Sequence, residues 1–211
     1  MRPAQTFAAS PDDRLTKQAF HWNGTIVAIA ASTGGVQAIQ QILEQFPADG
    51  PPVLIVQHMP SGITALFADR IDRHTLPHVV EARDGMPIAQ GMVYVAPGGS
   101  CHLDLSDGHV MRCRLVDAPP VNGHRPSGDV LLRSMARLTR GKAIGVILTG
   151  MGDDGATALL EMRRSGMHTI AQDEASALIY GMPKAAADCG AVEEMLPLAR
   201  IGARILELCQ C

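Results

Sequence analysis

The sequence contains few cysteines, and they form no recognisable pattern. Five of them are scattered along 211 residues, and no two stand in a C-x-x-C spacing. Secreted domains stabilised by disulfides carry an even, dense set, and structural zinc sites use closely spaced pairs. The sequence therefore argues against a disulfide framework and against a zinc site. We expect a protein of the reducing cytoplasm.

Long apolar runs and basic clusters are also missing. The longest uncharged apolar stretch, residues 25–31, is far shorter than the ~20 residues that cross a bilayer, and the N-terminus lacks a signal peptide's apolar core. The 18 basic and 21 acidic side chains give a net charge of −3, with no basic run longer than Arg163-Arg164. These absences argue against a membrane anchor and a nucleic-acid surface. Proteins or small molecules are the expected partners.

The composition that remains is that of one globular domain, with 46% hydrophobic and 18% charged residues. Residues 1–23 contain Pro3, Pro11 and an acidic pair but no sustained periodicity, which predicts a flexible N-terminal leader. We expect the globular domain to begin near Gly24 and to occupy residues 24–211.

Short apolar runs alternate with helical patterns along that domain. Runs such as 26–30 and 53–56 are each followed by apolar residues at helix spacing, which indicates βαβ units and a parallel sheet. Asp107-Gly108 is a strong signal for a two-residue hairpin turn, which would place Cys113 opposite His102. The predicted fold class is a three-layer α/β/α domain with a mostly parallel, doubly wound sheet and one antiparallel hairpin.

Three polar positions follow directly after predicted buried strands, where catalytic groups of open α/β sheets gather. Ser32 lies in a strand-to-helix turn similar to a nucleophile elbow, with Ala30 in place of its first glycine. His58 and the pair Asp153-Asp154 could supply the base and the acid that activate a serine hydroxyl. The residues alone do not decide which of the two aspartates would serve.

Each of these residues also has a structural interpretation. A Ser-Thr-Gly-Gly turn before a helix is typical of a helix cap, and Ser127 is likewise predicted to cap the helix that follows it. The segment 150–155 matches G-x-G-x-x-G, with Asp173 near the position of a ribose-binding acid. Two aspartates inside that turn would oppose a pyrophosphate, unless Asp153, Asp154, Asp173 and Glu174 bound Mg²⁺.

Longer motifs indicate a family. The sequence strongly resembles the catalytic domain of the chemotaxis protein-glutamate methylesterase family, CheB, over about residues 25 to 198. The motifs that carry the resemblance are Ala-Ser-Thr-Gly-Gly (31–35), Val-Gln-His-Met-Pro (56–60), Val-Ala-Pro-Gly-Gly (95–99), His-Arg-Pro-Ser (124–127), Leu-Thr-Gly-Met-Gly-Asp-Asp-Gly-Ala (148–156), Ala-Gln-Asp-Glu-Ala-Ser (171–176) and Gly-Met-Pro (181–183).

The resemblance implies a serine hydrolase that removes methyl groups from glutamate esters on chemoreceptors and releases methanol. Many members of the family also deamidate receptor glutamines. It places the catalytic triad on Ser32, His58 and Asp154, and the oxyanion hole on the backbone N–H groups of Thr33 and Met151. No cofactor or metal is implied. The implied partners are methylated chemoreceptor helices and other chemotaxis signalling proteins acting in trans.

Two departures from the family pattern affect these expectations. Ala30 stands where the family usually has glycine, so its methyl group could narrow the approach to Ser32. Residues 1–23 are too short for the receiver domain of the family's usual arrangement, so no receiver is expected in this chain. A non-catalytic regulatory or nucleotide-binding module with the same fold is the alternative function.

Overall fold

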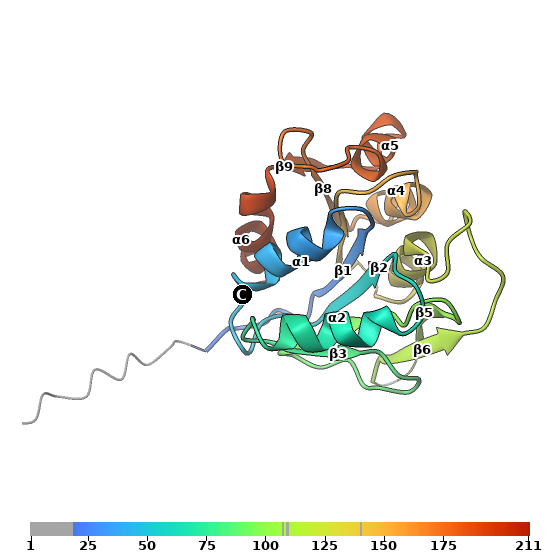
Figure 1. Cartoon of the computed structure of the whole chain (residues 1–211). Coiled ribbons are helices and arrows are strands. Elements are labelled where there is room, and N and C mark those ends of the chain that lie inside the picture. Colours follow the sequence, from blue (N-terminus) through green and yellow to red (C-terminus); the bar gives the residue numbers. More distant parts are fainter. Residues whose placement is uncertain (1–18, 107, 109, 140) are drawn as a thin grey trace, which may run out of the picture.

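The computed structural model describes residues 19–106, 108, 110–139 and 141–211 (Figure 1). Helices and strands alternate along most of it, as the sequence predicts. The strands are β1 (Ile26–Ala31), β2 (Val53–Gln57), β3 (His78–Glu81), β4 (Met92–Val95), β5 (His102–Ser106), β6 (Arg112–Val116), β7 (Ala143–Ile147), β8 (His168–Gln172) and β9 (Glu194–Leu196). The helices are α1 (Gly35–Leu43), α2 (Ile63–Asp72), α3 (Gly128–Leu138), α4 (Ala156–Arg164), α5 (Met182–Asp188) and α6 (Leu198–Cys209).

Seven strands form a parallel sheet in the order β3-β4-β2-β1-β7-β8-β9. The chain builds outward from β1 through β2 on one side, and β7 begins the other side. The neighbours β1 and β7 therefore flank the point where the topology switches. In folds of this kind, ligands bind outside the carboxyl ends of the strands at such a point.

Helices cover both faces of the sheet, which explains why every residue of β1 is buried. Val27, Ile29 and Ala31 pack in a core with apolar side chains of α1, α2 and α6. Ala28 and Ala30 pack in a second core, which includes residues of α3, α4, α5 and the hairpin. The predicted three-layer α/β/α architecture with a mostly parallel sheet is confirmed (Figure 1).

The antiparallel hairpin is present, but its predicted register is wrong. Strands β5 and β6 form a separate two-stranded sheet in which Cys113 pairs with Leu105, and His102 pairs with Val116. The second strand begins only at Arg112, so the connection is longer than a two-residue turn. The backbone of this strand also bonds on its other side, where Cys113 N–H donates to Met86 O at 2.8 Å. This pairing fixes a register that the turn sequence does not reveal.

Residues just before Gly24 are bonded to the rest of the chain. Trp22 forms a β-bridge with Gln210, and Asn23 N–H donates to Cys209 O at 2.9 Å. Phe20 N–H donates to the carboxylate of Asp49 at 2.9 Å. The end of the predicted leader is therefore packed against the C-terminal residues, while residues 1–18 lie outside the described part.

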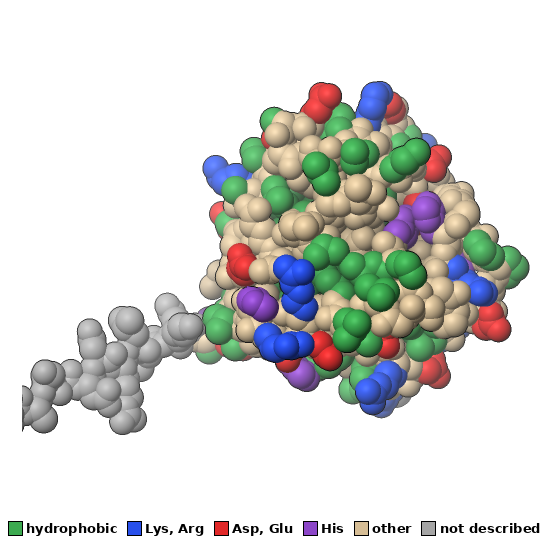
Figure 2. Space-filling model, viewed as in Figure 1, with side chains coloured by type: hydrophobic (Ala, Val, Ile, Leu, Met, Phe, Trp, Pro, Cys, Tyr) green, Lys and Arg blue, Asp and Glu red, His purple; other side chains and the backbone are tan. Residues whose placement is uncertain are grey.

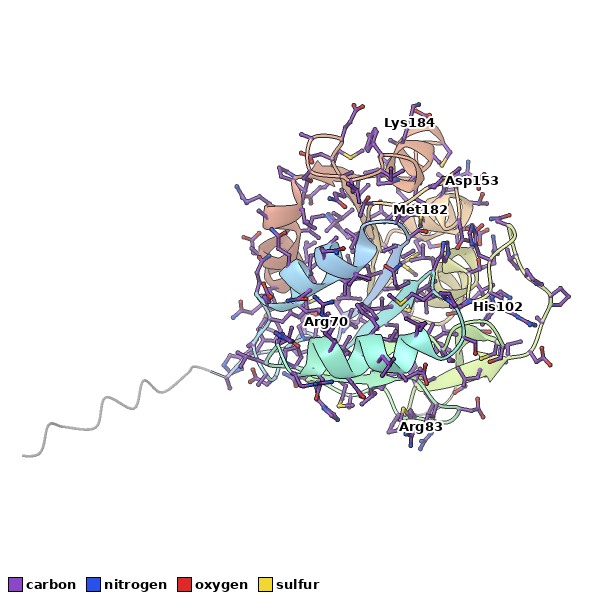
Figure 3. The ribbon with its side chains drawn as sticks, in the orientation of Figure 1. Arg70, Arg83, His102, Asp153, Met182 and Lys184 are labelled. Carbon is purple, nitrogen blue, oxygen red and sulfur yellow. The ribbon has the colours of Figure 1, made fainter. Side chains whose placement is uncertain are left out.

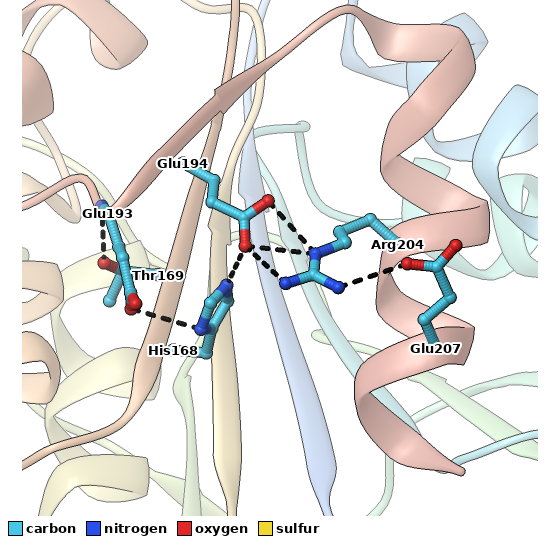
Figure 4. A network of polar contacts seen from close by, with 6 residues as sticks. All are labelled: His168, Thr169, Glu193, Glu194, Arg204 and Glu207. Carbon is cyan, nitrogen blue, oxygen red and sulfur yellow. Dashed lines mark hydrogen bonds and ion pairs between the residues drawn. The ribbon is translucent and has the colours of Figure 1, made fainter.

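A network of charged side chains joins the last helix to the edge of the sheet (Figure 4). Glu194 of β9 accepts from the guanidinium of Arg204 at 2.8 and 3.0 Å and from His168 of β8. Arg204 also bonds Glu207 at 3.1 Å within α6, and His168 bonds Glu193. These contacts connect β8, β9 and α6 far from the carboxyl ends of β1 and β2.

None of the helices in the described residues is both long and apolar enough to cross a membrane.

Candidate active site

Ser32 follows β1 in a tight turn that leads into α1. Its backbone N–H donates to Thr149 O at 3.0 Å, and its carbonyl accepts from Gly35 N–H at 2.8 Å. Gly34 has φ of 86°, a left-handed conformation that suits glycine at the start of this helix. A Cβ on Gly150 would lie 2.7 Å from the Cβ of Ser32, so the loop after β7 approaches the serine more closely than a larger residue would allow.

His58 follows β2 beside Ser32, because Ala31 and Gln57, the last residues of the two strands, are paired. The amide nitrogen of Gln57 donates to Ser32 O at 2.9 Å and to His58 O at 3.1 Å. The backbone N–H of His58 donates to the backbone carbonyl of Ala31 at 3.0 Å. The turns that carry the serine and the histidine are therefore bonded to each other through the backbone and through one buried amide.

Asp154 lies under the histidine with its side chain fully buried. Its Oδ2 is 2.8 Å from His58 Nε2. Burial acts to raise the pKa of Asp154, but hydrogen bonds from His58, from Ser127 and from the backbone outweigh burial and hold the pKa below its ordinary value. The carboxylate is therefore ionised at neutral pH.

The contact to Asp154 determines which nitrogen of His58 can act as a base. An ionised carboxylate only accepts hydrogen bonds, so Nε2 must carry the proton. Nδ1 is then the unprotonated nitrogen, and it is buried without a hydrogen-bond partner in the described part of the chain. Of the two ring nitrogens, Nδ1 alone is free to take a proton from a hydroxyl.

His124 stacks on His58, with ring centroids 3.8 Å apart and an angle of 9° between the ring planes. Burial, and then the proximity of His58, lower the pKa of His124, which favours a neutral ring beside the base. His124 belongs to one of the family motifs, His-Arg-Pro-Ser (124–127), but the sequence predicts no role for it. The stacking could not be foreseen, since the two residues are far apart in the chain.

The predicted oxyanion donors border the serine turn. The backbone N–H groups of Thr33 and Met151 donate to no other group in the described segments. Thr149 lies in the loop that leads to Met151, and its hydroxyl donates to Thr33 O at 2.9 Å, which joins the two loops. The same hydroxyl accepts from Ile179 N–H at 2.9 Å. These two N–H groups are therefore available as donors on neighbouring loops, and their role as an oxyanion hole stays a prediction.

Ser127 occupies the N-cap position of α3, as predicted, but its hydroxyl does not bond the helix. The hydroxyl donates to Asp154 Oδ1 at 2.6 Å instead. The Asp154 carboxylate also accepts hydrogen bonds from the first backbone N–H groups of the helix, those of Gly128 at 2.6 Å and Asp129 at 3.2 Å. The expected side-chain cap is wrong because a carboxylate from another loop takes that place.

The acids of the alternative nucleotide or Mg²⁺ site do not converge. Asp154 is buried against α3, whereas Asp153 is exposed near the start of α4 (Figure 3). Asp173 accepts from the backbone N–H of Ser176 at 3.0 Å within its own loop, and Glu174 is exposed. Within the described ranges, no three His, Cys, Asp or Glu side chains form a group that could hold a metal ion.

A model of the CheB methylesterase family matches residues 27–205, which include all the residues of this site. The chain belongs to the CheB methylesterase family. A CheB methylesterase catalytic domain from Thermotoga maritima has the same fold, with a TM-score of 0.85 and 36% sequence identity. That comparison covers 88% of this chain and 99% of the Thermotoga domain.

Two curated CheB relatives are more similar in sequence. A protein-glutamate methylesterase/protein-glutamine glutaminase of Rhizobium etli is 54% identical over 183 residues, 87% of this chain and 53% of the relative. A protein of Caulobacter vibrioides with the same name, numbered 1, is 51% identical over 201 residues, 95% of this chain and 58% of the relative. The chain spans a little over half the length of these curated relatives.

A surface recess of about 300 Å³ lies beside His58 and is lined also by Met59, Pro60, Gly123, His124, Arg125 and Pro126. Exposed apolar side chains border this region. Met151 is 75% exposed, and Ile63 and Leu66 of α2 are also exposed. Figure 2 shows apolar side chains gathered over α2.

Ala30, the departure from the CheB pattern, does not face this recess. Its side chain is fully buried, and a Cβ added at Gly128 would lie 2.8 Å from its methyl group. The extra methyl therefore packs against the start of α3. The approach that it narrows is that of the neighbouring backbone at Gly128, and its effect on activity stays a prediction.

Proposed function

We propose that the chain hydrolyses γ-glutamyl methyl esters on chemoreceptors, with Ser32 as nucleophile, His58 as general base and Asp154 as the acid that orients the base. The observation that carries this proposal is the 2.8 Å contact from Asp154 to His58 Nε2. That contact leaves Nδ1 unprotonated beside the turn of Ser32. The names of the relatives support the same activity.

The reaction begins when Ser32 Oγ attacks the ester carbonyl and transfers its proton to His58 Nδ1. The backbone N–H groups of Thr33 and Met151 stabilise the oxyanion that forms. As the tetrahedral intermediate collapses, the C–O bond to the methoxy group breaks, and the imidazolium returns the proton to release methanol. Water, deprotonated by His58, then attacks the acyl-enzyme, which yields glutamate and restores the serine.

The same site would deamidate receptor glutamines. A primary amide offers the same carbonyl carbon to Ser32, and the imidazolium would protonate the leaving nitrogen to release ammonia. The names of the relatives include the glutaminase activity, which supports a receptor glutamine as the second substrate. We expect this reaction in the cytoplasm, with other chemotaxis signalling proteins acting in trans.

The proposal is tested by methanol release from chemoreceptors that carry radiolabelled methyl esters. Replacing Ser32 or His58 by Ala should lower the rate at least about 10⁴-fold, because the residues of such a triad act as a unit. Ser165→Ala is the matched control, since this serine is exposed and its hydroxyl bonds only its own helix at Glu161 O. Near-normal release by Ser32→Ala would reject the mechanism, and binding of methylated receptor without turnover would favour a regulatory module.

A further inference from the structure

The hydroxyl of Ser127 contacts the acid of the proposed triad from the side opposite the histidine. Ser127 is fully buried, and its Oγ donates to Asp154 Oδ1 at 2.6 Å. Because the side chain is closed off from the surface, it has no route to a receptor substrate. Any influence of Ser127 on the reaction must pass through Asp154.

All four hydrogen bonds to Asp154 come from groups fixed in the fold. Oδ1 accepts from Ser127 Oγ and from Asp129 N–H, and Oδ2 accepts from Gly128 N–H and from His58 Nε2. The backbone donors are the first N–H groups of α3, where the helix dipole favours a negative charge. Ser127 is the only side chain besides His58 that bonds this carboxylate in the described part of the molecule.

Ser127 is itself held in place by the hairpin. Its backbone N–H donates to Nδ1 of His102 at 3.2 Å, and the other ring nitrogen of His102 is 3.0 Å from Pro119 O. His102 lies on β5 and is 1% exposed (Figure 3). One continuous set of hydrogen bonds therefore leads from the hairpin through Ser127 and Asp154 to the ring of His58.

The helix that begins after Ser127 is also joined to the helix after Asp154. Asp129 of α3 accepts from the backbone N–H of Ala158 in α4 at 2.9 Å, while Asp154 accepts from the first turn of α3. The first turn of α3 is thus bonded to Asp154, which precedes α4, and the first turn of α4 is bonded to Asp129, which lies on α3. This exchange fixes the distance between Ser127 and Asp154, so the 2.6 Å contact is a property of the packed helices.

We propose that Ser127 is a positioning residue of the hydrolytic site, which orients the Asp154 carboxylate toward His58. This proposal rests on the proposed function, since it concerns the same reaction. Without the hydroxyl, Oδ1 keeps only the 3.2 Å bond from Asp129 N–H, so the carboxylate is held less firmly toward Nε2. The histidine would then be less well held in the tautomer that leaves Nδ1 unprotonated.

The same loss changes the response to pH. The Ser127 hydroxyl is one of the donors that hold the pKa of Asp154 below its ordinary value, so its removal raises the pKa of this carboxyl. The other ionisable groups around Asp154 and His58 are His124, which stacks on the ring of His58, Asp129 on α3, and Asp153, whose charge acts on His124. All three remain unchanged in a Ser127 variant.

The experiment compares Ser127→Ala with wild type by methanol release and by fluorophosphonate labelling of Ser32 across a range of pH. We expect kcat to fall about tenfold to a hundredfold, the effect of one hydrogen bond to a charged group, with KM unchanged. The acidic limb of the labelling profile should move to higher pH. Ser127→Thr keeps the hydroxyl and should restore most of the rate.

Ser134→Ala is the matched control, because Ser134 is equally buried on α3 but bonds only its own helix at Leu131 O. It should change neither rate nor pH profile. If Ser127→Ala does not fold, Ser127→Cys replaces it, since a thiol has a similar shape but is a weak donor. A folded Ala or Cys variant with the wild-type kcat and pH profile would overturn the role of Ser127. Absence of methanol release by wild type would instead count against the proposed function.

Discussion

At the scale of single residues, two adjacent aspartates have opposite surroundings. Asp154 is buried and bonded to His58, whereas Asp153 is exposed. We predict that Asp154→Asn lowers kcat on the order of 10⁴-fold, because an amide cannot hold the histidine in the required tautomer. Asp153→Asn should retain close to wild-type activity. Initial rates of methanol release measure the activity of both variants. An equal loss in the two would show that Asp154 is not the acid that orients His58.

The sequence could predict the strand ends that carry the site, but not the contacts beneath them. Ser32 and His58 stand out because each follows an apolar run, and the choice of Asp154 came from the resemblance. The sequence predicts that Ser127 caps its own helix, because only bonding partners that are near in the chain can be recognised from the sequence. Its bond to Asp154, 27 positions away, depends on how two helices pack.

At the scale of elements, the hairpin is tied to α3 through one buried acid. Asp104 of β5 accepts from Arg114 of β6 and, at 3.2 Å, from Arg137 of α3. Its side chain is 7% exposed, while both arginines are about half exposed. We predict that Asp104→Asn lowers the free energy of unfolding by about 1–3 kcal/mol, because two charged hydrogen bonds at a buried acceptor weaken.

Urea unfolding at neutral pH measures this change. Asp117→Asn serves as the control, because Asp117 is 91% exposed and makes one long contact with Arg125 at 3.3 Å. Exposed pairs of this kind contribute little, so the control should stay within about 0.5 kcal/mol of wild type. Equal stability of both variants would mean that Asp104 does not fasten the hairpin.

Most helices and strands could be predicted from the sequence, because apolar runs and apolar residues at helix spacing indicate which faces are buried. The predicted strand 53–56 differs from β2 (Val53–Gln57) by one residue. The hairpin register was not predictable from Asp107-Gly108, since β6 begins later and its backbone also bonds Met86. Pairing partners outside the hairpin overrode the turn signal.

At the scale of the whole molecule, the site combines loops from both halves of the sheet. Ser32 and His58 come from β1 and β2, whereas Asp154 and Met151 follow β7 on the other side of the switch. The mutual placement of these residues therefore depends on the integrity of the whole sheet, including its distant β9 edge.

Glu194 makes this edge sensitive to acid. Hydrogen bonding to Arg204, with a further contribution from His168, holds the pKa of Glu194 below its ordinary value, although burial opposes the effect. A carboxylate with a depressed pKa stabilises the fold fully above its unfolded pKa, about 4.3, and this contribution is lost as pH falls through the folded value. We predict that Glu194→Gln lowers the free energy of unfolding at pH 6 by up to about 1 kcal/mol.

The difference between wild type and Glu194→Gln should shrink as pH falls from about 5 to below 4, because the wild-type carboxylate becomes protonated there and loses its ionic partner. Urea unfolding of both proteins at a series of pH values measures the difference. Asp154, whose pKa is also lowered, remains in both proteins and cancels in the comparison. Glu174→Gln, at an exposed position, should follow wild type at every pH. A difference that stayed constant with pH would show that Glu194 acts through packing rather than through its charge.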